Sequence, residues 1–544
     1  MKEYFTFDNL SNFVALFVVF FSVIVTVYSF GFMKGRKGLL RYYLYILLTL
    51  VASLGVVFAN HLVVLIIFWG FLGFLLYLLI GFGESERTSY TAKKTFIIIG
   101  GTDAIMLLGL ALIWHLTGTF KMGEFSIPLN SKVAIVAYIS LAIGAFAKAG
   151  AMPFHTWVPD TAEDAPTPVT AFLPASLDKL LGIYFLARIS LNLFQMSPAM
   201  NTFLMIVGSF TIVAAVMMAL IQHDFKRLLG YHAVSQVGYM VLGIGTGNPI
   251  GIAGGMFHML NHAIYKSCLF LSSGSVEKET GTTKLDKLGG LATAMPITFF
   301  SFLVASFAIS GVPPFNGFAS KWMVYQGIIQ TASTNKYLWI VWLIAAMFGS
   351  ALTLASFMKL IHAIFLGQKS DIKKKYKETS PLMWIPTGIL ALLCIVFGVF
   401  AYRIPLKYFI LPSFDFQVSF SGMWNSSLAT ALLIVGVLIG TVIYLLGTIL
   451  KVRETETFIG GEAIQDNPEV RVSGTEFYNT VQDIKVLKVI YALARKKLFD
   501  PYEVGTKLTF GFNALLRYIH NGVLSTYLAW CLLGMIILFY IILR

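Results

Sequence analysis

Residues 146–188 read FAKAGAMPFHTWVPDTAEDAPTPVTAFLPASLDKLLGIYFLAR. It places Lys148 and Lys179 inside a polypeptide made almost wholly of apolar runs. Between the lysines lie an acidic cluster and five prolines: Asp160, Glu163, Asp164, Pro153, Pro159, Pro166, Pro168 and Pro174. A charge inside a membrane helix is costly and marks an ion route by default. A helix broken at that depth is tolerated only where protein or water satisfies its backbone.

The composition indicates a membrane protein. Hydrophobic residues make up 57% of the 544, and charged residues only 12%, about half the share usual in soluble domains. Apolar runs of about 20 residues follow one another along the chain, the length that a helix needs to span a bilayer. We therefore expect an all-α polytopic fold, whose first run is a span rather than a cleavable signal.

The apolar pattern predicts about fourteen transmembrane helices. Two of the segments, 133–158 and 296–331, are too long and too rich in Gly and Pro to be plain helices. The expected spans are 10–33, 42–59, 61–82, 95–115, 133–158, 167–191, 199–221, 230–246, 250–274, 296–331, 338–366, 382–402, 425–450 and 521–543.

The basic residues predict the orientation. Of the 40 Lys and Arg residues, 27 fall in connections on one face, 7 on the opposite face and 6 within spans. Cytoplasmic loops are rich in Lys and Arg, so the rich face is expected in the cytoplasm and both termini outside, in a cell membrane. The net charge of +14 then reflects these loops rather than a nucleic-acid partner. The connections on the rich face are 34–41, 83–94, 222–229, 275–295, 367–381 and 451–520.

Two halves of the chain each contain a lysine close to a proline within an apolar segment. Lys148 precedes Pro153 by five residues, whereas Lys321 follows Pro314 by seven. Two broken helices with a lysine on opposite sides of the break indicate an inverted repeat, although broken spans recurring in a large bundle would look the same. The expected order is a peripheral helix (1–40), a first inverted-repeat half (41–194), a second half (195–366), two further spans (367–450), a cytoplasmic-side loop with a lateral helix (451–520) and a transmembrane anchor (521–544).

Residues 475–520 mix apolar residues at helical spacing with many cations. The segment is too charged to span and amphipathic enough to lie along a surface. A lateral strut of two helices interrupted at Pro501 and a helix lying on the lipid surface fit the pattern equally.

His258, His262 and Lys266 fall at i, i+4 and i+8, on one stripe of a helix. Imidazoles titrate near neutrality, so this line suits proton relay through water between the side chains. Hydrogen-bonded packing histidines are the alternative. A zinc site is disfavoured, since no acidic or Cys ligand accompanies them.

Within the expected spans the only carboxylates are Asp103 and Asp178, the candidate counter-ions for the buried lysines. Asp178 and Lys179 are adjacent, so their side chains diverge by about 100° on a helix and need not pair. Lys359 lies close to the cytoplasmic end of its span, where it either snorkels or joins the ion route.

No cofactor or metal site is expected. The three cysteines, Cys268, Cys394 and Cys531, lie in apolar runs without a CxxC pair, which argues against iron–sulfur or zinc binding. No phosphate-cradling Gly loop or serine triad occurs. We expect the chain to make no chemical bonds itself.

Five segments together resemble the antiporter-like subunits of respiratory complex I, Mrp-type cation/proton antiporters and membrane-bound hydrogenases or sulfur reductases. They are KAGAMPFHTWVPD, APTPV, DFKRLLGYHAVSQVGY, FHMLNHAIYKSCLFLSSGSV and SGVPPFNGFASK, in family order, within residues 10–366. The amphipathic C-terminal segment is similar to the lateral-helix extension of the large distal members.

The resemblance implies a proton or Na⁺ channel. Lys148 would be the central lysine of the first half, Lys179 the connecting lysine and Lys321 the residue of the second broken helix. His258, His262 and Lys266 would be the central bridge. The family usually has a Trp-Glu pair in the span corresponding to 61–82, with the glutamate as counter-ion. This chain reads FWGFLG, with Gly70 in that place, so Asp103 or an acid from another subunit would have to substitute.

We therefore expect a proton- or Na⁺-translocating subunit of a membrane-bound, redox-driven complex, with other membrane subunits as partners. Two alternatives remain open at this point. One is a degenerate, non-pumping paralogue that clamps its neighbours through the lateral helix. The other is the membrane module of an inorganic-carbon uptake system.

Overall fold

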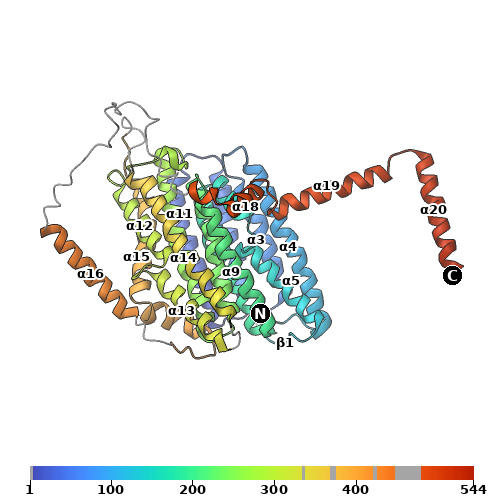
Figure 1. Cartoon of the computed structure of the whole chain (residues 1–544), viewed down its shortest axis with the longest axis horizontal. Helices are drawn as coiled ribbons and strands as arrows, with labels where there is room; N and C mark the ends of the chain where they lie inside the picture. The colour runs from blue at the N-terminus through green and yellow to red at the C-terminus, as the bar shows by residue number, and fades with distance from the viewer. Residues whose placement is uncertain (1–3, 334–336, 368–374, 421–425, 447–478, 544) are drawn as a thin grey trace. The chain divides into compact units, whose positions relative to one another are not determined.

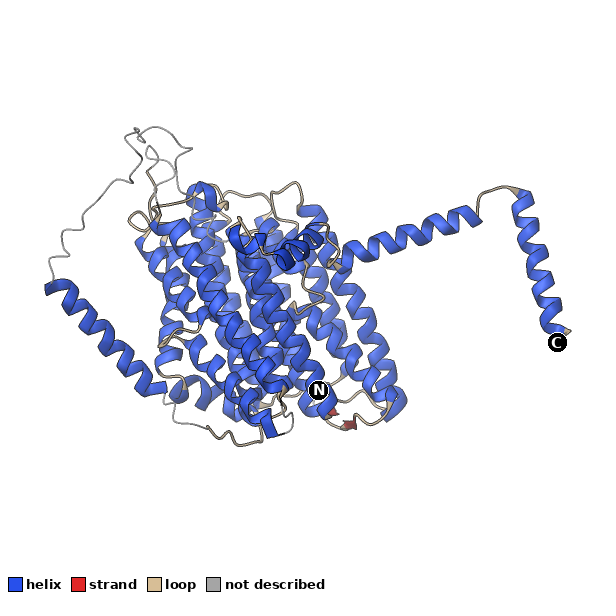
Figure 2. Cartoon of the chain, in the orientation of Figure 1, coloured by secondary structure: helices blue, strands red, loops and turns tan. Residues whose placement is uncertain are grey.

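The computed structural model describes residues 4–333, 337–367, 375–420, 426–446 and 479–543. The chain divides into two compact units, Met1–Gln482 and Asp483–Arg544. Helices make up nearly all of the secondary structure drawn in Figure 2, and the one strand pair joins two residues of each strand, β1 (Ile127–Pro128) and β2 (Phe194–Gln195), in parallel. The expected all-helical polytopic fold is confirmed.

The first unit is a bundle of long helices. Figure 1 shows α9, α11, α12, α14 and α15 running along it, and these helices pack on one another. Its helices are α1 (Asn9–Phe32), α2 (Leu39–Phe58), α3 (Leu62–Ile80), α4 (Thr88–Thr117), α5 (Lys132–Ala149), α6 (Trp157–Asp164), α7 (Thr167–Phe172), α8 (Asp178–Arg188), α9 (Pro198–Leu220), α10 (Phe225–Gly245), α11 (Pro249–Thr280), α12 (Pro296–Ser310), α13 (Asn316–Gln330), α14 (Leu338–Ile361), α15 (Pro381–Val399), α16 (Ser426–Leu446) and α17 (Asn479–Asp483).

Short 3₁₀ and π segments join or extend these helices. A π-helical turn at η1 contains Pro174 and links α7 to α8, so the helix is interrupted at this proline. The segments are η1 (Leu173–Leu177), η2 (Ile189–Leu193), η3 (Leu285–Lys287), η4 (Thr331–Ser333), η5 (His362–Leu366), η6 (Tyr402–Ile410) and η7 (Leu411–Ser413).

Ten helices of the described residues are long and apolar enough to cross a membrane. They correspond to ten of the fourteen expected spans. Three of the other four are α10 and α11, which carry many polar residues, and the segment 296–331, which is broken. The fourth, 425–450, lies partly outside the described residues.

Both expected breaks are present, and they share the pattern G-x-x-P-F. The first, between α5 and α6, reads GAMPF (150–154), and the second, between α12 and α13, reads GVPPF (311–315). Each starts with a glycine in the left-handed region, Gly150 at φ +79° and Gly311 at φ +81°, a conformation that costs glycine little. Both helices therefore stop at a conformation that a residue with a side chain would resist.

The two broken helices approach their breaks from opposite ends of the bundle. We call the end that holds β1 and β2 the strand end, and the end that holds connections 83–94, 222–229 and 275–295 the charged end. α5 follows β1 and so starts at the strand end, whereas α12 follows connection 275–295 and starts at the charged end.

The second unit holds α18 (Lys485–Arg495), α19 (Pro501–Ile519) and α20 (Leu524–Ile542). The interruption expected at Pro501 is confirmed, because α19 begins there with Asp500 as its N-cap. α20 is apolar and long enough to span a membrane. The loop 451–474, which we placed on the cytoplasmic side, lies outside the described residues.

Helices α9 and α10 touch backbone to backbone. A Cβ added to Gly238 of α10 would lie 2.5 Å from the Gly208 carbonyl oxygen and 2.8 Å from the Ile212 nitrogen of α9. The contact therefore requires that Gly238 have no side chain. It holds α10, which carries several of the polar residues described below, against its neighbour.

We predict that Gly238→Ala lowers the free energy of unfolding by roughly 1–3 kcal/mol, because one methyl group must push two packed helices apart. Gly101→Ala in α4 is the matched control, since nothing lies within 4 Å of a Cβ added there. That variant should be neutral or up to about 1 kcal/mol more stable, as alanine favours helix. Thermal unfolding of the protein in detergent measures both. Equal stability of the two variants would contradict the close contact.

Candidate functional site: a line of buried lysines and histidines

Polar backbone groups at the first break form hydrogen bonds with other groups of the protein. The amides of Gly150 and Ala151 both donate to the Phe146 carbonyl at 2.8 Å, and Trp157 Nε1 donates to the Ala147 carbonyl at 3.0 Å. The Met152 amide donates to Thr211 Oγ1 at 3.2 Å. Irregular backbone inside a membrane is stable only when partners of this kind replace water.

Lys148, the last but one residue of α5, is fully buried. Its Nζ lies 3.5 Å from the Trp69 carbonyl oxygen and 5.3 Å from the Trp69 ring. Trp69 Nε1 in turn donates to Asp103 Oδ1 at 3.0 Å. The carboxylates whose charges act on Lys148 are Asp178 and Asp103. The two candidate counter-ions are therefore both close to this lysine.

Asp178 and Lys179 are the first two residues of α8, and the charge of Asp178 acts on Lys148. Neither carboxylate oxygen of Asp178 nor Lys179 Nζ has a hydrogen-bond partner among the described residues. The charge of Asp178 acts on both lysines. Lys179 Nζ lies 5.5 Å from the Trp157 ring, and a Cβ added to Gly150 would be 3.1 Å from it. This amine thus reaches the first break, and no direct bond joins it to its sequence neighbour.

The middle of the line belongs to α11, where His258, His262 and Lys266 are all fully buried. His262 has no hydrogen-bond partner among the described residues at either ring nitrogen, and the charges of Lys179, Lys266 and His258 act on it. His258 Nδ1 lies 2.9 Å from Ser320 Oγ. This helix therefore links the first break to α13.

Three polar side chains surround His258. Its Nε2 lies 3.2 Å from both Gln236 Oε1 and Tyr265 Oη. The sequence did not single out Gln236, Tyr265 or Ser320 as site residues. A glutamine within the span 230–246 is a signal that could have found Gln236. Hydroxyl residues are common in apolar helices, so the roles of Tyr265 and Ser320 come only from contacts between helices.

Lys321 completes the line at the second break. Its Nζ donates to the Ile309 carbonyl at 2.8 Å and lies 4.7 Å from the Tyr239 ring. Ile309 is in the last turn of α12, so the amine binds a carbonyl that the break leaves without its helical partner. The charge of Lys321 also acts on His258.

The side chain of Lys266 points away from this line, toward α10. Its Nζ donates to the Leu229 carbonyl of α10 at 2.7 Å and lies 5.7 Å from the Phe357 ring of α14. The helical stripe of three residues is thus as expected, but its third member points toward a neighbouring helix. Among the described residues, no group of three or more His, Cys, Asp or Glu is placed to hold a metal ion.

Known proteins of similar sequence identify the family of this chain. Residues 59–355 match the model of the family described as NADH:quinone oxidoreductase/Mrp antiporter, transmembrane. This chain belongs to that family. It is 35% identical over 421 residues to the Na(+)/H(+) antiporter subunit A1 of Staphylococcus haemolyticus, a match that covers 72% of this chain and 52% of that protein. The corresponding Staphylococcus saprophyticus protein is 35% identical over 401 residues, with 69% and 50% covered. The chain thus spans about half the length of these curated relatives.

Solved structures share the fold. A chain of the membrane-bound sulfane sulfur reductase, an archaeal respiratory membrane complex, matches with a TM-score of 0.79 at 25% identity, covering 98% of this chain and 89% of that one. A chain of the Mrp complex from Dietzia sp. DQ12-45-1b matches with a TM-score of 0.70 at 21% identity, covering 75% and 84%. The antiporter-like chain described here is accordingly a multi-pass membrane protein.

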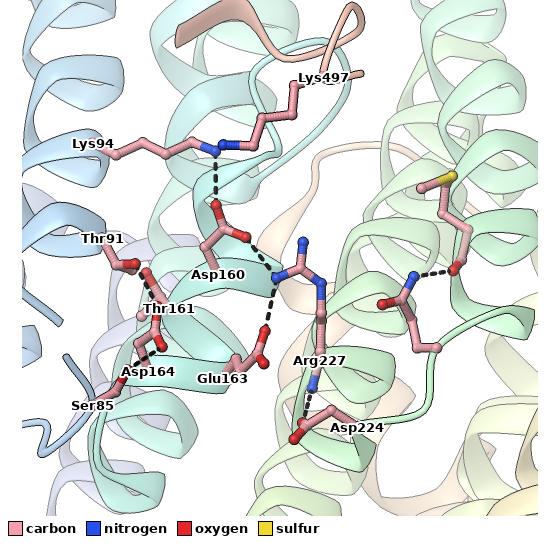
Figure 3. A network of polar contacts seen from close by, with 12 residues as sticks. Ser85, Thr91, Lys94, Asp160, Thr161, Glu163, Asp164, Asp224, Arg227 and Lys497 are labelled. Atoms are coloured by element: carbon pink, nitrogen blue, oxygen red, sulfur yellow. Dashed lines mark hydrogen bonds and ion pairs between the residues drawn. The ribbon is translucent and has the colours of Figure 1, made fainter. Parts of the chain in front are cut away.

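At the charged end, a network of ion pairs surrounds the acidic cluster of α6 (Figure 3). Asp160 accepts from Lys94 Nζ at 2.7 Å and pairs with Arg227 Nη1 at 2.9 Å. The same guanidinium binds Glu163 at 2.8 Å. These contacts join α4, α6 and α10. The sequence showed the acids, but their partners lie far away in the chain.

Asp164, also in Figure 3, accepts hydrogen bonds from Ser85 Oγ at 2.9 Å and Thr91 Oγ1 at 2.6 Å. Lys284 Nζ approaches Glu163 at 3.3 Å and Asp224 at 3.4 Å. Connections 83–94, 222–229 and 275–295, which the charge count assigned to one face, therefore meet at one end of the bundle.

Burial alone would raise the pKa of the Glu163 carboxyl, but hydrogen bonding and attraction to Arg227, together with Lys284, outweigh it and lower the pKa below its ordinary value of 4.5. A carboxylate with a lowered pKa contributes stability that is present above its ordinary pKa and is lost as the pH falls through the lowered value. Glu163 therefore stabilises the fold at neutral pH and ceases to do so in acid.

We predict that Glu163→Gln lowers the melting temperature at pH 7 and reduces the further loss of stability on acidification below about pH 4.5. Glu86→Gln is the control, because Glu86 is an exposed acid on the same connection as Ser85. Melting curves recorded at intervals from pH 7 to pH 3 compare the variants. If Glu163→Gln and the parent protein lost stability in parallel, the ion pair would not contribute as described.

Proposed function

We propose that this chain translocates H⁺ or Na⁺ as the antiporter-like subunit of a larger membrane complex. The observation that carries the proposal is the line of buried ionisable side chains between the two breaks: Lys148, Lys179, His262, His258 and Lys321, with Lys266 beside it. An ionisable group inside a membrane bundle is by default part of an ion route. Here six such groups share one interior.

The chemistry of the line is exchange of charge between neighbours. Asp103, Lys148, Asp178 and Lys179 alternate in sign, and Asp178 acts on both lysines without bonding either. In a protein interior, charges a few ångströms apart interact by several kcal/mol. A proton gained or lost at one position therefore changes the charge state favoured at the next. Protein movement or a charge elsewhere in the complex would set the direction.

The architecture that suits this function is a pair of inverted halves with the line across the middle, within about fourteen spans. Support comes from the shared GAMPF and GVPPF breaks, which α5 and α12 enter from opposite ends of the bundle. The concentration of Lys and Arg favours a cytoplasmic location for the charged end and an outside location for the termini. The amphipathic α19 would then be the lateral helix on the cytoplasmic side.

The partners are other membrane subunits. The similar chains belong to a Na(+)/H(+) antiporter, an Mrp complex and an archaeal respiratory complex, so electron transfer or a Na⁺ gradient would drive the ion. The family's redox-driven members favour a translocating oxidoreductase in which this chain makes no bonds.

Replacing a lysine at either break tests the line. Lys148→Gln and Lys321→Gln should each lower ion transport by roughly a hundredfold or more, since a glutamine cannot exchange a proton. Lys278→Gln is the matched control, because Lys278 also binds a backbone carbonyl, that of Phe32 at 3.0 Å, but lies in the last turn of α11. Vesicles that contain the native complex report proton movement through a pH-sensitive dye, with and without Na⁺, alongside electron transfer. Unchanged transport in both variants would favour the structural-clamp alternative.

Asp103 gives a second test. Asp103→Asn keeps an oxygen for the Trp69 indole but removes the negative charge near Lys148, and transport should fall by roughly tenfold or more. Adding Gly70→Glu should restore part of the activity, because nothing lies within 4 Å of a Cβ at Gly70 and the family places its glutamate there. The same dye assay compares the single and double variants. Full activity of Asp103→Asn would show that this carboxylate is not the counter-ion.

A further inference from the structure

The connection between α1 and α2 carries cations without any acid. Residues 34–41 read KGRKGLLR, with four Lys or Arg and no Asp or Glu. Connections 83–94, 222–229 and 275–295 have 3, 2 and 3 cations, but they also have 2, 1 and 3 acids. The connection 34–41 is therefore the most unbalanced of these four in charge.

This connection is fixed at the charged end by one of its own cations. Arg36 Nε pairs with Glu84 Oε1 at 3.3 Å, and the guanidinium carbon lies 5.3 Å from the centre of the Phe32 ring. The Phe32 carbonyl accepts a hydrogen bond from Lys278 Nζ at 3.0 Å. Glu84 and Lys278 belong to two of the other connections at the charged end, so α1 and α2 meet there too.

The other three cations of the connection are exposed, and we call them the basic corner: Lys34, Lys37 and Arg41. None of them forms an ion pair with another described residue. By contrast, the cations Lys94 and Arg227 in Figure 3 have carboxylate partners within the protein. Anions that match the basic corner must therefore come from outside the described part of the chain.

An exposed apolar stripe starts at the basic corner and continues along α2. Its members recur at spacings of four, three and four residues, which places them on one face of the helix, and they are 85%, 48%, 55% and 53% exposed: Leu40, Leu44, Leu47 and Val51. Phe30 of α1, which is 50% exposed, lies beside this face, because its ring is 5.1 Å from that of Tyr43. The surface thus combines cations at the end of the bundle with an apolar wall along the helices.

We propose that the basic corner and the apolar stripe bind an anionic phospholipid. Its phosphate contacts Lys34, Lys37 and Arg41, and one acyl chain lies along the stripe of α2. Charge complementarity selects this occupant, since Lys and Arg form their strongest hydrogen bonds with ionised oxygens such as those of phosphate. A phospholipid carries the anion and the apolar chain on one molecule, as the surface requires. The site is separate from the proposed ion route and goes beyond it.

A variant that removes the charge of the basic corner tests the site: Lys34→Gln, Lys37→Gln and Arg41→Gln combined. The matched control removes three charges from exposed positions of connections that also carry acids: Arg87→Gln, Lys93→Gln and Lys287→Gln combined. Phosphatidylglycerol is titrated into the native complex in detergent, and native mass spectrometry counts the bound molecules. Parallel titrations use phosphatidylcholine, which has no net charge, and inorganic phosphate, which has no acyl chain. Melting temperatures are recorded in each case.

Phosphatidylglycerol should bind the test variant roughly a hundredfold more weakly than the parent complex, because each Lys or Arg near an anionic lipid contributes about fivefold in affinity. The control should bind like the parent. Phosphatidylglycerol should raise the melting temperature of the parent and control complexes only, and all three should melt alike without it, which shows that the fold is intact.

Three outcomes would overturn the site. An equal loss of binding in the control would mean that the lipid responds to the charge of the whole surface. An equal effect of phosphatidylcholine would show that the basic corner is not used, and an equal effect of inorganic phosphate that the apolar stripe is not. If the test variant failed to assemble, Arg41→Gln alone would decide, with roughly fivefold weaker binding expected and parental binding overturning the site.

Discussion

Backbone carbonyls that lose their helical partners inside a membrane must find other donors, and the two breaks depend on this constraint. At the second break the donor to Ile309 is an amine, Lys321. At the first break Trp157 and the amides of Gly150 and Ala151 serve the last turn of α5, and Lys148 reaches the Trp69 carbonyl instead. The lysines are therefore held in the bundle partly by neutral dipoles. A charge held in this way can leave without opening an ion pair.

The scarcity of carboxylates has a related consequence. Among the described residues of the expected spans, Asp103 and Asp178 are the only carboxylates that accompany Lys148, Lys179, Lys266 and Lys321. Breaking a buried ion pair leaves an uncompensated charge, which costs several kcal/mol. Asp178 avoids a fixed pair by acting on two lysines without bonding either. The arrangement spreads one negative charge over two positive positions, which suits the proton exchange that we propose along the line.

The features of the fold and of the site that could be predicted from the sequence are those set by residues close together in the chain. Glycine and proline at 150–153 and 311–314 mark the breaks because they act on their own backbone, and the spacing of His258, His262 and Lys266 sets their common stripe on one helix. The direction of Lys266 was not predictable, since Leu229 and Phe357 come from two other helices. His232 is visible in the sequence of residues 224–240. Its burial, and the lack of a hydrogen-bond partner at either ring nitrogen among the described residues, follow from how the helices pack and could not be predicted. The Trp69–Asp103 bond likewise required two helices to meet.

The charged end and the central line treat their polar groups in opposite ways. Asp160, Arg227 and Glu163 are tied by several short contacts each and join three helices. Along the line, by contrast, Asp178, Lys179 and His262 have polar atoms without hydrogen bonds among the described residues. If those groups served only stability, apolar residues of similar volume would serve as well or better. Side chains that form several ion pairs fix the positions of their helices, whereas side chains without fixed partners can change partner. The first kind lies at the charged end and the second kind along the central line. The rigid network thus anchors α6 while the groups next to its break remain able to exchange charge.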